Sequence, residues 1–157
     1  MTYLTVIGAE EVTTKRLKTA FQNAFFNVWQ DDNDENEFVV EIDNQKIEII
    51  LDPQRKTLII KKVNCAGIKA DVLDQIEAQI YQKCHDISSH YSLCNFGCVI
   101  MDDRNTLFFV NTHEVRFNHG LNIAQFIDDV RFFKVTNRAA VIDMAEFLKA
   151  QKAFLDD

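Results

Sequence analysis

The feature that most constrains the fold is a run of three β-rich segments between residues 38 and 63. The segments read "FVVEI", "QKIEIILD" and "TLIIKKV", and the short turn signals "DN" and "PQRK" separate them. β-branched residues joined by such short turns predict a three-strand antiparallel meander. In the middle segment Ile47 and Ile49 alternate with Glu48, so one face of this sheet is expected to be apolar.

Two helices are predicted on either side of the meander. Thr13 or Thr14 can cap a first helix whose apolar residues recur at intervals of three and four. They are Leu17, Ala20, Phe21, Ala24, Phe25 and Val28. A second helix is predicted from about Lys69 to about His85, followed by a loop from Asp86 to Cys94. Its apolar side is expected to carry Val72, Leu73, Ile76, Ile80, Tyr81 and Cys84.

The second half of the chain adds a hairpin and more helix. "FGCVIMDDRNTLFFVNT" predicts two strands joined by the turn "DDRN". From Gly120 the pattern is helical, with a break at "VTN" where Asn137 could cap a last helix. The predicted order is α-β-β-β-α-β-β-α-α, an α+β fold with a single antiparallel five-stranded sheet, made of the meander plus the hairpin and packed with helices.

Length and charge bound the class of protein. The 157 residues fit one domain, 1–157, with a net charge of −7. Nucleic-acid backbones require a basic face and anionic membranes repel an acidic one, so neither is an expected partner. The N-terminus lacks the pattern of a secretory signal, and no apolar run is long enough to cross a bilayer. We therefore expect a cytoplasmic protein whose four cysteines are reduced.

The stretch "CHDISSHYSLCNFGC", residues 84–98, is the most conspicuous candidate for chemistry. Structural zinc requires four ligands, usually as paired Cys-x-x-Cys knuckles, whereas Cys94 and Cys98 are separated by three residues and have no second knuckle. The favoured interpretation is that Cys84 packs on the second helix and Cys98 fills the sheet, with no metal or cofactor. The alternative is a small metal- or ligand-binding protein that uses the Cys84–Cys98 region with His85 and His90.

A calcium loop is disfavoured in the acidic connection "QDDNDENE". Asp32, Asp34 and Asn36 have the alternate spacing of the first calcium ligands. However, Glu37 stands where the sharp turn needs Gly, and Asp43 stands where a bidentate Glu is expected. The stretch is expected to be a solvated connection.

Catalytic patterns are also weak. The chain has no G-x-S-x-G elbow and no Gly-rich phosphate loop after a strand. His113 and Glu114 could form an acid–base pair with His119 close by. Adjacent strand residues face opposite sides of a sheet, so this pair is expected to split, and the chain is expected not to be an enzyme.

The thirteen phenylalanines carry more information. One face of the helix after Asn122 carries a regular apolar stripe, and Phe132 falls nearly opposite it. The stripe comprises Ile123, Phe126, Ile127, Val130 and Phe133. In the last helix Phe147 and Phe154 likewise lie well round from the main apolar side. Either these helices pack against each other and the sheet, or they leave a patch for a second subunit or a bound segment. Phe132, Phe147 and Phe154 are the candidate contact residues of such a patch.

The element order and two segments of the sequence resemble the YbjN-type, type III secretion chaperone-like family. The segments are "TTKRLKTAFQNAFFNVW…EFVVEIDNQKIEIILDPQRKTLIIKKV" and "CNFGCVIMDDRNTLFFVNTHEVRFNHGLNIAQFIDDVRFF". The resemblance covers about residues 13–133, and a helical extension is predicted at 137–155. It implies a chaperone-like fold, often dimeric, that binds polypeptides or acts in regulation, with no catalytic residue to carry over.

The sequence thus favours a non-enzymatic protein-binding or regulatory domain. Its expected partner is another polypeptide or a second copy of itself, most simply as a homodimer, through apolar helix or strand surfaces.

Overall fold

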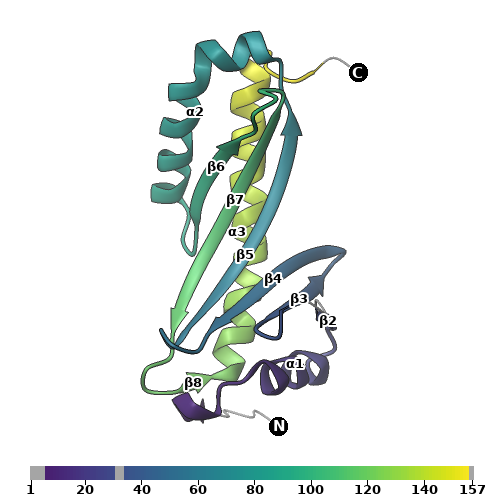
Figure 1. Cartoon of the computed structure of the whole chain (residues 1–157), viewed down its shortest axis with the longest axis vertical. Helices are drawn as coiled ribbons and strands as arrows, with labels where there is room; N and C mark the ends of the chain where they lie inside the picture. Colours follow the sequence, from purple (N-terminus) through teal and green to yellow (C-terminus); the bar gives the residue numbers. More distant parts are fainter. Residues whose placement is uncertain (1–5, 31–33, 156–157) are drawn as a thin grey trace. The chain divides into compact units, whose positions relative to one another are not determined.

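The protein is described by a computed structural model that covers residues 6–30 and 34–155 (Figure 1). Its chain forms two compact units, each built from two separate stretches of sequence. The first unit comprises Met1–Lys61 and His113–Lys134, and the second comprises Lys62–Thr112 and Val135–Asp157. Each unit has its own hydrophobic core, and the two are described in turn.

The first unit contains the predicted meander. Strands β3 (Glu37–Ile42), β4 (Gln45–Asp52) and β5 (Thr57–Gly67) pair antiparallel, with Ile42 opposite Gln45 and Asp52 opposite Thr57. Asp43 and Asn44 form the two-residue turn between β3 and β4 with φ values of 49° and 62°. Positive φ at both positions is what a tight hairpin turn requires, and Asp and Asn adopt it more readily than most residues.

The same unit contains a strand that the sequence pattern does not predict. Helix α1 spans Thr14–Asn23, and the Thr13 hydroxyl caps it by accepting a hydrogen bond from the Arg16 N–H. The chain then forms strand β2 (Asn27–Gln30), which pairs antiparallel with β3. Val28, predicted as the last apolar residue of the helix, therefore lies in β2. Strands β1 (Val6–Ile7) and β8 (Leu121–Asn122) form a separate two-stranded sheet.

The core of the first unit lies on one face of its sheet. Alternate residues of β3 and β4 point into it, and α1 and the first half of helix α3 (Ile123–Ala150) cover it. The buried residues from these elements are Leu17, Phe21, Phe38, Val40, Ile42, Ile47, Ile49, Leu51, Phe126, Ile127, Val130 and Phe133. The stripe predicted after Asn122 is confirmed at its last four positions.

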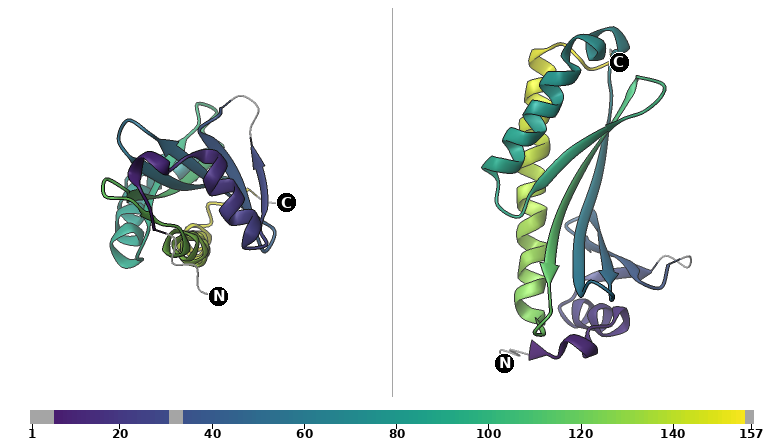
Figure 2. Two further views of the ribbon diagram at one scale, coloured as in Figure 1. Left: turned by 90° about the horizontal axis from the view of Figure 1, so that it is seen from below. Right: turned by 60° about the vertical axis from the view of Figure 1, so that its left-hand side comes forward.

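The second unit contains the predicted hairpin and second helix. Strands β6 (Asn95–Ile100) and β7 (Thr106–Arg116) pair antiparallel from Asn95 opposite Thr112 to Ile100 opposite Leu107. Helix α2 spans Ala70–His90, one turn beyond its predicted end, and so takes up part of the predicted loop. It lies beside the second half of α3 (Figure 2), where the Lys83 ammonium and the Asp143 carboxylate are 2.5 Å apart.

Three features of the predicted fold are wrong. The prediction has a single sheet, whereas β1 and β8 form a second, two-stranded sheet. The larger sheet has six strands in the order β2-β3-β4-β5-β7-β6, not five, because β2 adds to the meander. The predicted break at "VTN" is absent, because α3 is one helix from Ile123 to Ala150. Asn137 is not a cap: it is buried inside α3, where its Oδ1 accepts a hydrogen bond from Asn111 Nδ2 at 3.3 Å. Asn side chains favour helix ends because they can bond to the nearby backbone. In this structure the Asn137 side chain bonds to Asn111 on β7 instead.

After α3 the chain turns back onto the second unit, where Phe154 forms an isolated β-bridge with Ile68. The predicted division into a core at 13–133 and an extension at 137–155, within one domain, stays a prediction. Among residues 6–30 and 34–155, the structure contains no helix with the length and apolar character needed to span a bilayer.

Candidate functional site

A groove in the first unit is lined by residues of α1 and of the start of α3. It has a volume of about 930 Å³. Its apolar lining comes from Ala20 and Ala24 on α1 and from Ile123, Ala124 and Ile127 on α3. The remaining lining residues are Thr13, Lys15, Arg16, Thr19 and Asn23. An open groove with an apolar floor and a polar rim is the usual form of a site for a peptide or another helix.

The charges at this groove are of one sign. The described residues that line it include two cations, Lys15 and Arg16, and no carboxylate. Arg16 Nη1 is paired with Glu11 Oε1 at 2.7 Å. The Gly8 N–H and then the Arg16 guanidinium hold the pKa of Glu11 below its ordinary value. Within residues 6–30 and 34–155 no ion pair involves Lys15, so its charge is available to solvent or to a ligand.

Phe25 directly follows Ala24, a lining residue of the groove, and is 97% exposed without lining the groove itself. Its backbone has φ of 66°. The Phe25 N–H donates to the Gln22 carbonyl at 3.0 Å, and the Phe26 N–H donates to the Phe21 carbonyl at 3.1 Å. This pair of bonds is the Schellman ending of a helix, in which Gly is the usual residue at the left-handed position. A bulky side chain there is unfavourable for the backbone, and its full exposure is unfavourable for an aromatic ring.

Phe25 is therefore the functional candidate that sequence reasoning missed. The spacing of α1 assigns it to the buried stripe with Leu17 and Phe21, and in the structure it is the most exposed large hydrophobic residue described. Its neighbour Phe26 packs against the core instead, and the Arg131 guanidinium lies 5.0 Å from the Phe26 ring. The only signal in the sequence is the pair of adjacent phenylalanines at a helix end, because both cannot face the same side.

The three predicted contact residues lie in different surroundings. Phe132 belongs to the first unit and is 49% exposed on α3. Phe147 and Phe154 belong to the second unit and are half-buried against its core. The structure thus does not gather the three within one unit, and their role in a contact surface stays a prediction.

The cysteine-rich stretch folds so that two of its thiols meet. Cys84 is buried on α2 as predicted, and Cys98 is half-buried on β6. The interaction between these two thiols lowers the pKa of Cys98 and raises the pKa of Cys84. Cys94 is also half-buried, and burial raises the pKa of its thiol, with Asn111 opposing the shift.

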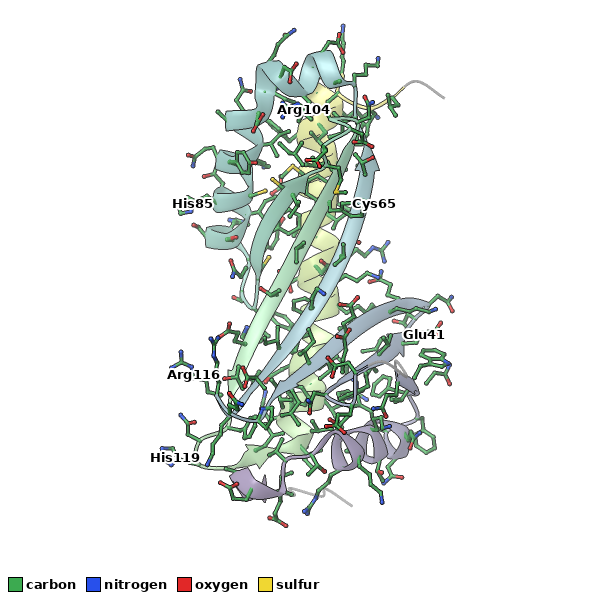
Figure 3. All side chains as sticks on the ribbon, in the orientation of Figure 1. Glu41, Cys65, His85, Arg104, Arg116 and His119 are labelled. Carbon is green, nitrogen blue, oxygen red and sulfur yellow. The ribbon has the colours of Figure 1, made fainter. Side chains whose placement is uncertain are left out.

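The other members of the proposed metal set are elsewhere. His85 points away from the sheet on α2, and Cys65 lies on β5 with its side chain exposed (Figure 3). His90 is exposed and stacks edge-on against Tyr91. No group of three or more His, Cys, Asp or Glu side chains suited to a metal occurs within residues 6–30 and 34–155. In the calcium pattern, Asp32 lies outside the described residues, and Asp34 Oδ1 accepts from the Asn36 N–H at 2.8 Å as part of a turn.

The acid–base candidates on β7 face different surroundings, as expected of adjacent strand residues. His113 is half-buried, and burial lowers the pKa of its imidazole, with Asp129 and Glu114 opposing the shift. Glu114 is exposed and lines a second, smaller depression of about 280 Å³ with Arg116 and Arg55. His113 and His119 do not line that depression. His113 and Glu114 therefore do not share that depression.

Comparisons with known proteins bear on the fold alone. No protein-family model matches the sequence, and a search of curated proteins finds no match. Among solved structures, the chain is similar to YbjN from E. coli, a candidate transcription regulator. The TM-score is 0.64 at 12% sequence identity, over 92% of this chain and 97% of the other. It is also similar to an uncharacterized protein from Methanothermobacter thermautotrophicus. That TM-score is 0.60 at 15% identity, over 86% of this chain and 98% of the other.

These similarities extend over nearly the whole of each solved chain and agree with the resemblance drawn from element order. At such low identity they establish architecture and leave side-chain chemistry to be argued from this molecule. The chain therefore has an α+β fold similar to that of YbjN. The larger sheet of this chain has six strands.

Proposed function

We propose that the chain is a non-enzymatic protein-binding or regulatory domain, and that it binds through the groove between α1 and α3 together with Phe25. The observation that carries this proposal is the conformation of Phe25, which combines a left-handed backbone with an almost fully exposed ring. Both properties lower the stability of the free protein, and a contact surface is the simplest benefit that offsets them.

The groove favours a particular kind of partner. Its apolar floor fits the apolar face of an amphipathic helix, which would bury Ala20, Ala24 and Ile127 from water. Its rim carries Lys15 and Arg16 and no carboxylate among the described lining residues, although the whole chain has a net charge of −7. Charge complementarity of this kind selects partners and speeds their association. We infer that the occupant is an acidic amphipathic segment of another polypeptide.

A regulatory role is consistent with the fold. The similar E. coli protein is a candidate transcription regulator, and at 12% identity only the architecture transfers with the structure. The acidic charge of this chain opposes contact with a nucleic-acid backbone, so regulation here would act through protein contacts.

The test replaces Phe25 with Gly and compares the variant with Lys152→Gly. Lys152 occupies the same position at the end of α3: its φ is 54°, its N–H donates to the Lys149 carbonyl, and the Ala153 N–H donates to the Leu148 carbonyl. Lys152→Gly therefore relieves the same backbone strain without removing an apolar ring. Both variants are expected to gain about 0.5–1 kcal/mol in free energy of unfolding, measured by urea denaturation.

Binding separates the two variants. The probe is a pair of fluorescent amphipathic helical peptides with the same apolar face, one flanked by Glu and one by Lys. We expect the acidic peptide to bind the parent chain at least about tenfold more tightly than the basic one, a difference of about 1.4 kcal/mol. Phe25→Gly should weaken that binding at least about tenfold, whereas Lys152→Gly should leave it unchanged.

Equal binding of the two peptides, or equal loss in both variants, would refute the groove as the binding surface. Sedimentation velocity without peptide tests the alternative occupant. A dimer in the parent chain that Phe25→Gly dissociates would assign the surface to a second copy, which is the predicted homodimer.

A further inference from the structure

Two thiols of the second unit come from a helix and a strand that contact each other. Cys84 is on the buried side of α2 and Cys98 is on β6, and both belong to or pack against the same hydrophobic cluster. Helix α2 and strand β6 are in direct contact, and the two thiols influence each other's pKa as neighbours. A disulfide requires a sulfur–sulfur distance of about 2.05 Å and Cα atoms within about 7 Å of each other.

The two thiols are not equivalent. The interaction with Cys84 lowers the pKa of Cys98, and the same interaction, with burial, raises the pKa of Cys84. Burial and Glu77 oppose the shift at Cys98. Cys98 is also the more accessible of the two, because it is half-buried whereas Cys84 is almost fully enclosed. Cys98 is thus the thiol that a small reagent reaches as a thiolate, and thiolates are the nucleophilic form.

The remaining cysteines are in different situations. Cys94 is four residues before Cys98, but burial raises its pKa to about 11, with Asn111 opposing the shift. Cys65 is exposed on β5 and has no sulfur partner among the described residues. Sequence spacing alone would pair Cys94 with Cys98, whereas the fold pairs Cys84 with Cys98.

We propose that Cys84 and Cys98 form a reversible redox site that closes to an intramolecular disulfide when the chain meets a hydroperoxide. In the first step the Cys98 thiolate attacks the terminal peroxide oxygen and breaks the O–O bond. The leaving alkoxide or hydroxide takes a proton, and Cys98 becomes a sulfenic acid.

In the second step the sulfur of Cys84, as its proton leaves, attacks the Cys98 sulfur and displaces hydroxide, which is released as water. The net reaction oxidises two thiols to one disulfide and reduces one hydroperoxide to an alcohol and water. A dithiol reductant reverses it by exchange. The site fits a compartment that keeps thiols reduced by default, in which such disulfides form transiently as sensors.

The test uses the full chain with Cys65→Ser, which removes the exposed thiol and leaves three. The protein is treated with a few equivalents of hydrogen peroxide, denatured, and alkylated to count its free thiols. We expect the count to fall from three to one, and dithiothreitol to restore it. Cleavage at the aromatic residues Tyr91 and Phe96 separates the three cysteines, so mass spectrometry should find the fragment with Cys84 linked to the fragment with Cys98.

Two further variants test which two cysteines form the disulfide. Cys94→Ala should still lose both remaining thiols, whereas Cys98→Ala should form no disulfide and keep its thiols at the same peroxide dose. The proposal is overturned if all three thiols survive, if Cys94 appears in the linked fragment, or if the disulfide joins two chains. Because this unit does not contain the groove or Phe25, failure here leaves the proposed function untouched.

Discussion

At the scale of single residues, two amides lie opposite each other inside the second unit. Asn111 on β7 and Asn137 on α3 are both buried, and the Asn111 amide donates to the Asn137 oxygen. The Oδ1 atom of Asn111 is buried without a hydrogen-bond partner in the described part of the chain. Buried polar groups of this kind favour one alignment of the surrounding elements over others, because any shift leaves them unpaired.

Replacing Asn137 with Ala should therefore be more damaging than its size suggests. The change removes the acceptor for Asn111 and leaves a second group without its partner, so we expect a loss of about 1–3 kcal/mol in free energy of unfolding. Urea denaturation followed by circular dichroism measures it. Asn95→Ala, at an exposed position on β6, is the control and should change stability by less than about 0.5 kcal/mol. A loss for Asn137→Ala no larger than that of the control would contradict the prediction.

His113 gives the fold a pH dependence of predictable sign. Burial lowers the pKa of its imidazole in the folded state, and the carboxylates of Asp129 and Glu114 only partly oppose this. The unfolded chain, with an ordinary histidine pKa of about 6.5, then binds more protons than the folded chain over the interval below that value. The stability contribution of neutral His113 is present above about pH 6.5 and is lost as the pH falls from there through the lowered pKa.

Thermal unfolding of the parent chain and of His113→Gln between pH 5 and 8 would measure this effect. We expect the difference between their unfolding temperatures to change in the acidic half of that range and to stay constant above it. NMR titration of the ring protons should give a midpoint below about 6.5. A midpoint above that value would reverse the sign and rule the prediction out.

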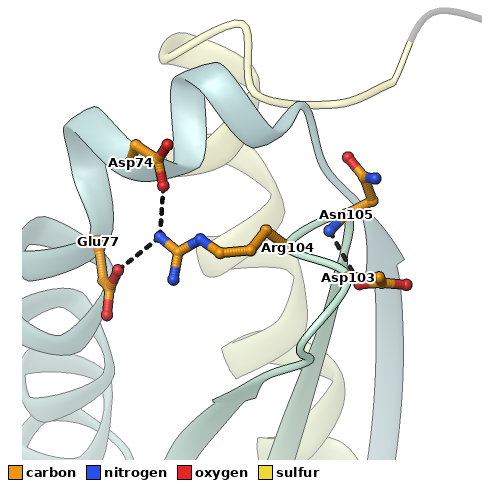
Figure 4. A network of polar contacts seen from close by, with 5 residues as sticks. All are labelled: Asp74, Glu77, Asp103, Arg104 and Asn105. Carbon is orange, nitrogen blue, oxygen red and sulfur yellow. Dashed lines mark hydrogen bonds and ion pairs between the residues drawn. The ribbon is translucent and has the colours of Figure 1, made fainter.

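At the scale of secondary-structure elements, one arginine connects the β6–β7 turn to helix α2. Arg104 has φ of 56° in the turn, and its Nη2 donates to Asp74 Oδ1 at 2.6 Å and to Glu77 Oε2 at 2.8 Å (Figure 4). The turn itself is held by Asp103, whose Oδ1 accepts from the Asn105 and Thr106 N–H groups. The Thr106 hydroxyl donates to Asp103 Oδ2. The backbone hydrogen bonds and this hydroxyl hydrogen bond lower the pKa of Asp103.

Arg104→Gly separates the two roles of this residue. The variant keeps the positive φ of the turn and removes both ion pairs with α2. We expect faster amide hydrogen exchange in the first turns of α2 and in residues 101–106, with the rest of α2 unchanged. Arg55→Gly, in the β4–β5 turn, is the control, because the Arg55 guanidinium pairs with Asp52 of its own turn. Unchanged exchange in α2 would show that Arg104 does not hold the turn against the helix.

The elements that sequence predicts best are those whose signals are local. The "DN" turn between β3 and β4 needs only two residues with positive φ, and the meander follows from it. Strand β2 was missed because its four residues follow a helix end without a break in apolar spacing, and pairing with β3 decides their conformation. The continuous α3 was missed because the partner of Asn137 comes from β7, 26 residues earlier in the chain. Contacts at long range in sequence leave no local pattern.

The same distinction applies to the candidate site. Cys84 and Cys98 were assigned correctly to helix and sheet packing, but their mutual contact depends on how α2 lies against β6. Phe25 was assigned to the buried stripe because helix periodicity was extended one residue too far. A Schellman ending without Gly gives no signature in a single sequence. Both site features therefore required coordinates.

At the scale of the whole molecule, the chain carries 24 acidic and 17 basic residues. Binding to duplex DNA depends mainly on phosphate neutralisation, and its affinity rises steeply as salt is lowered. If the chain regulates through protein contacts, it should show no salt-sensitive binding to duplex DNA. Fluorescence anisotropy of a labelled duplex, at about 50 and 200 mM salt, would measure this. Affinity that strengthens at the lower salt would indicate a basic face formed in spite of the net charge.

The two compact units are interleaved along the chain, since each takes one stretch from either half of it. Strands β5 and β7 and helix α3 all continue across a boundary between units. No single cut in the gene can therefore release either unit as an intact module. Truncation at any of these boundaries should leave at least one unit incomplete, and the fragment should be more sensitive to proteases than the full chain.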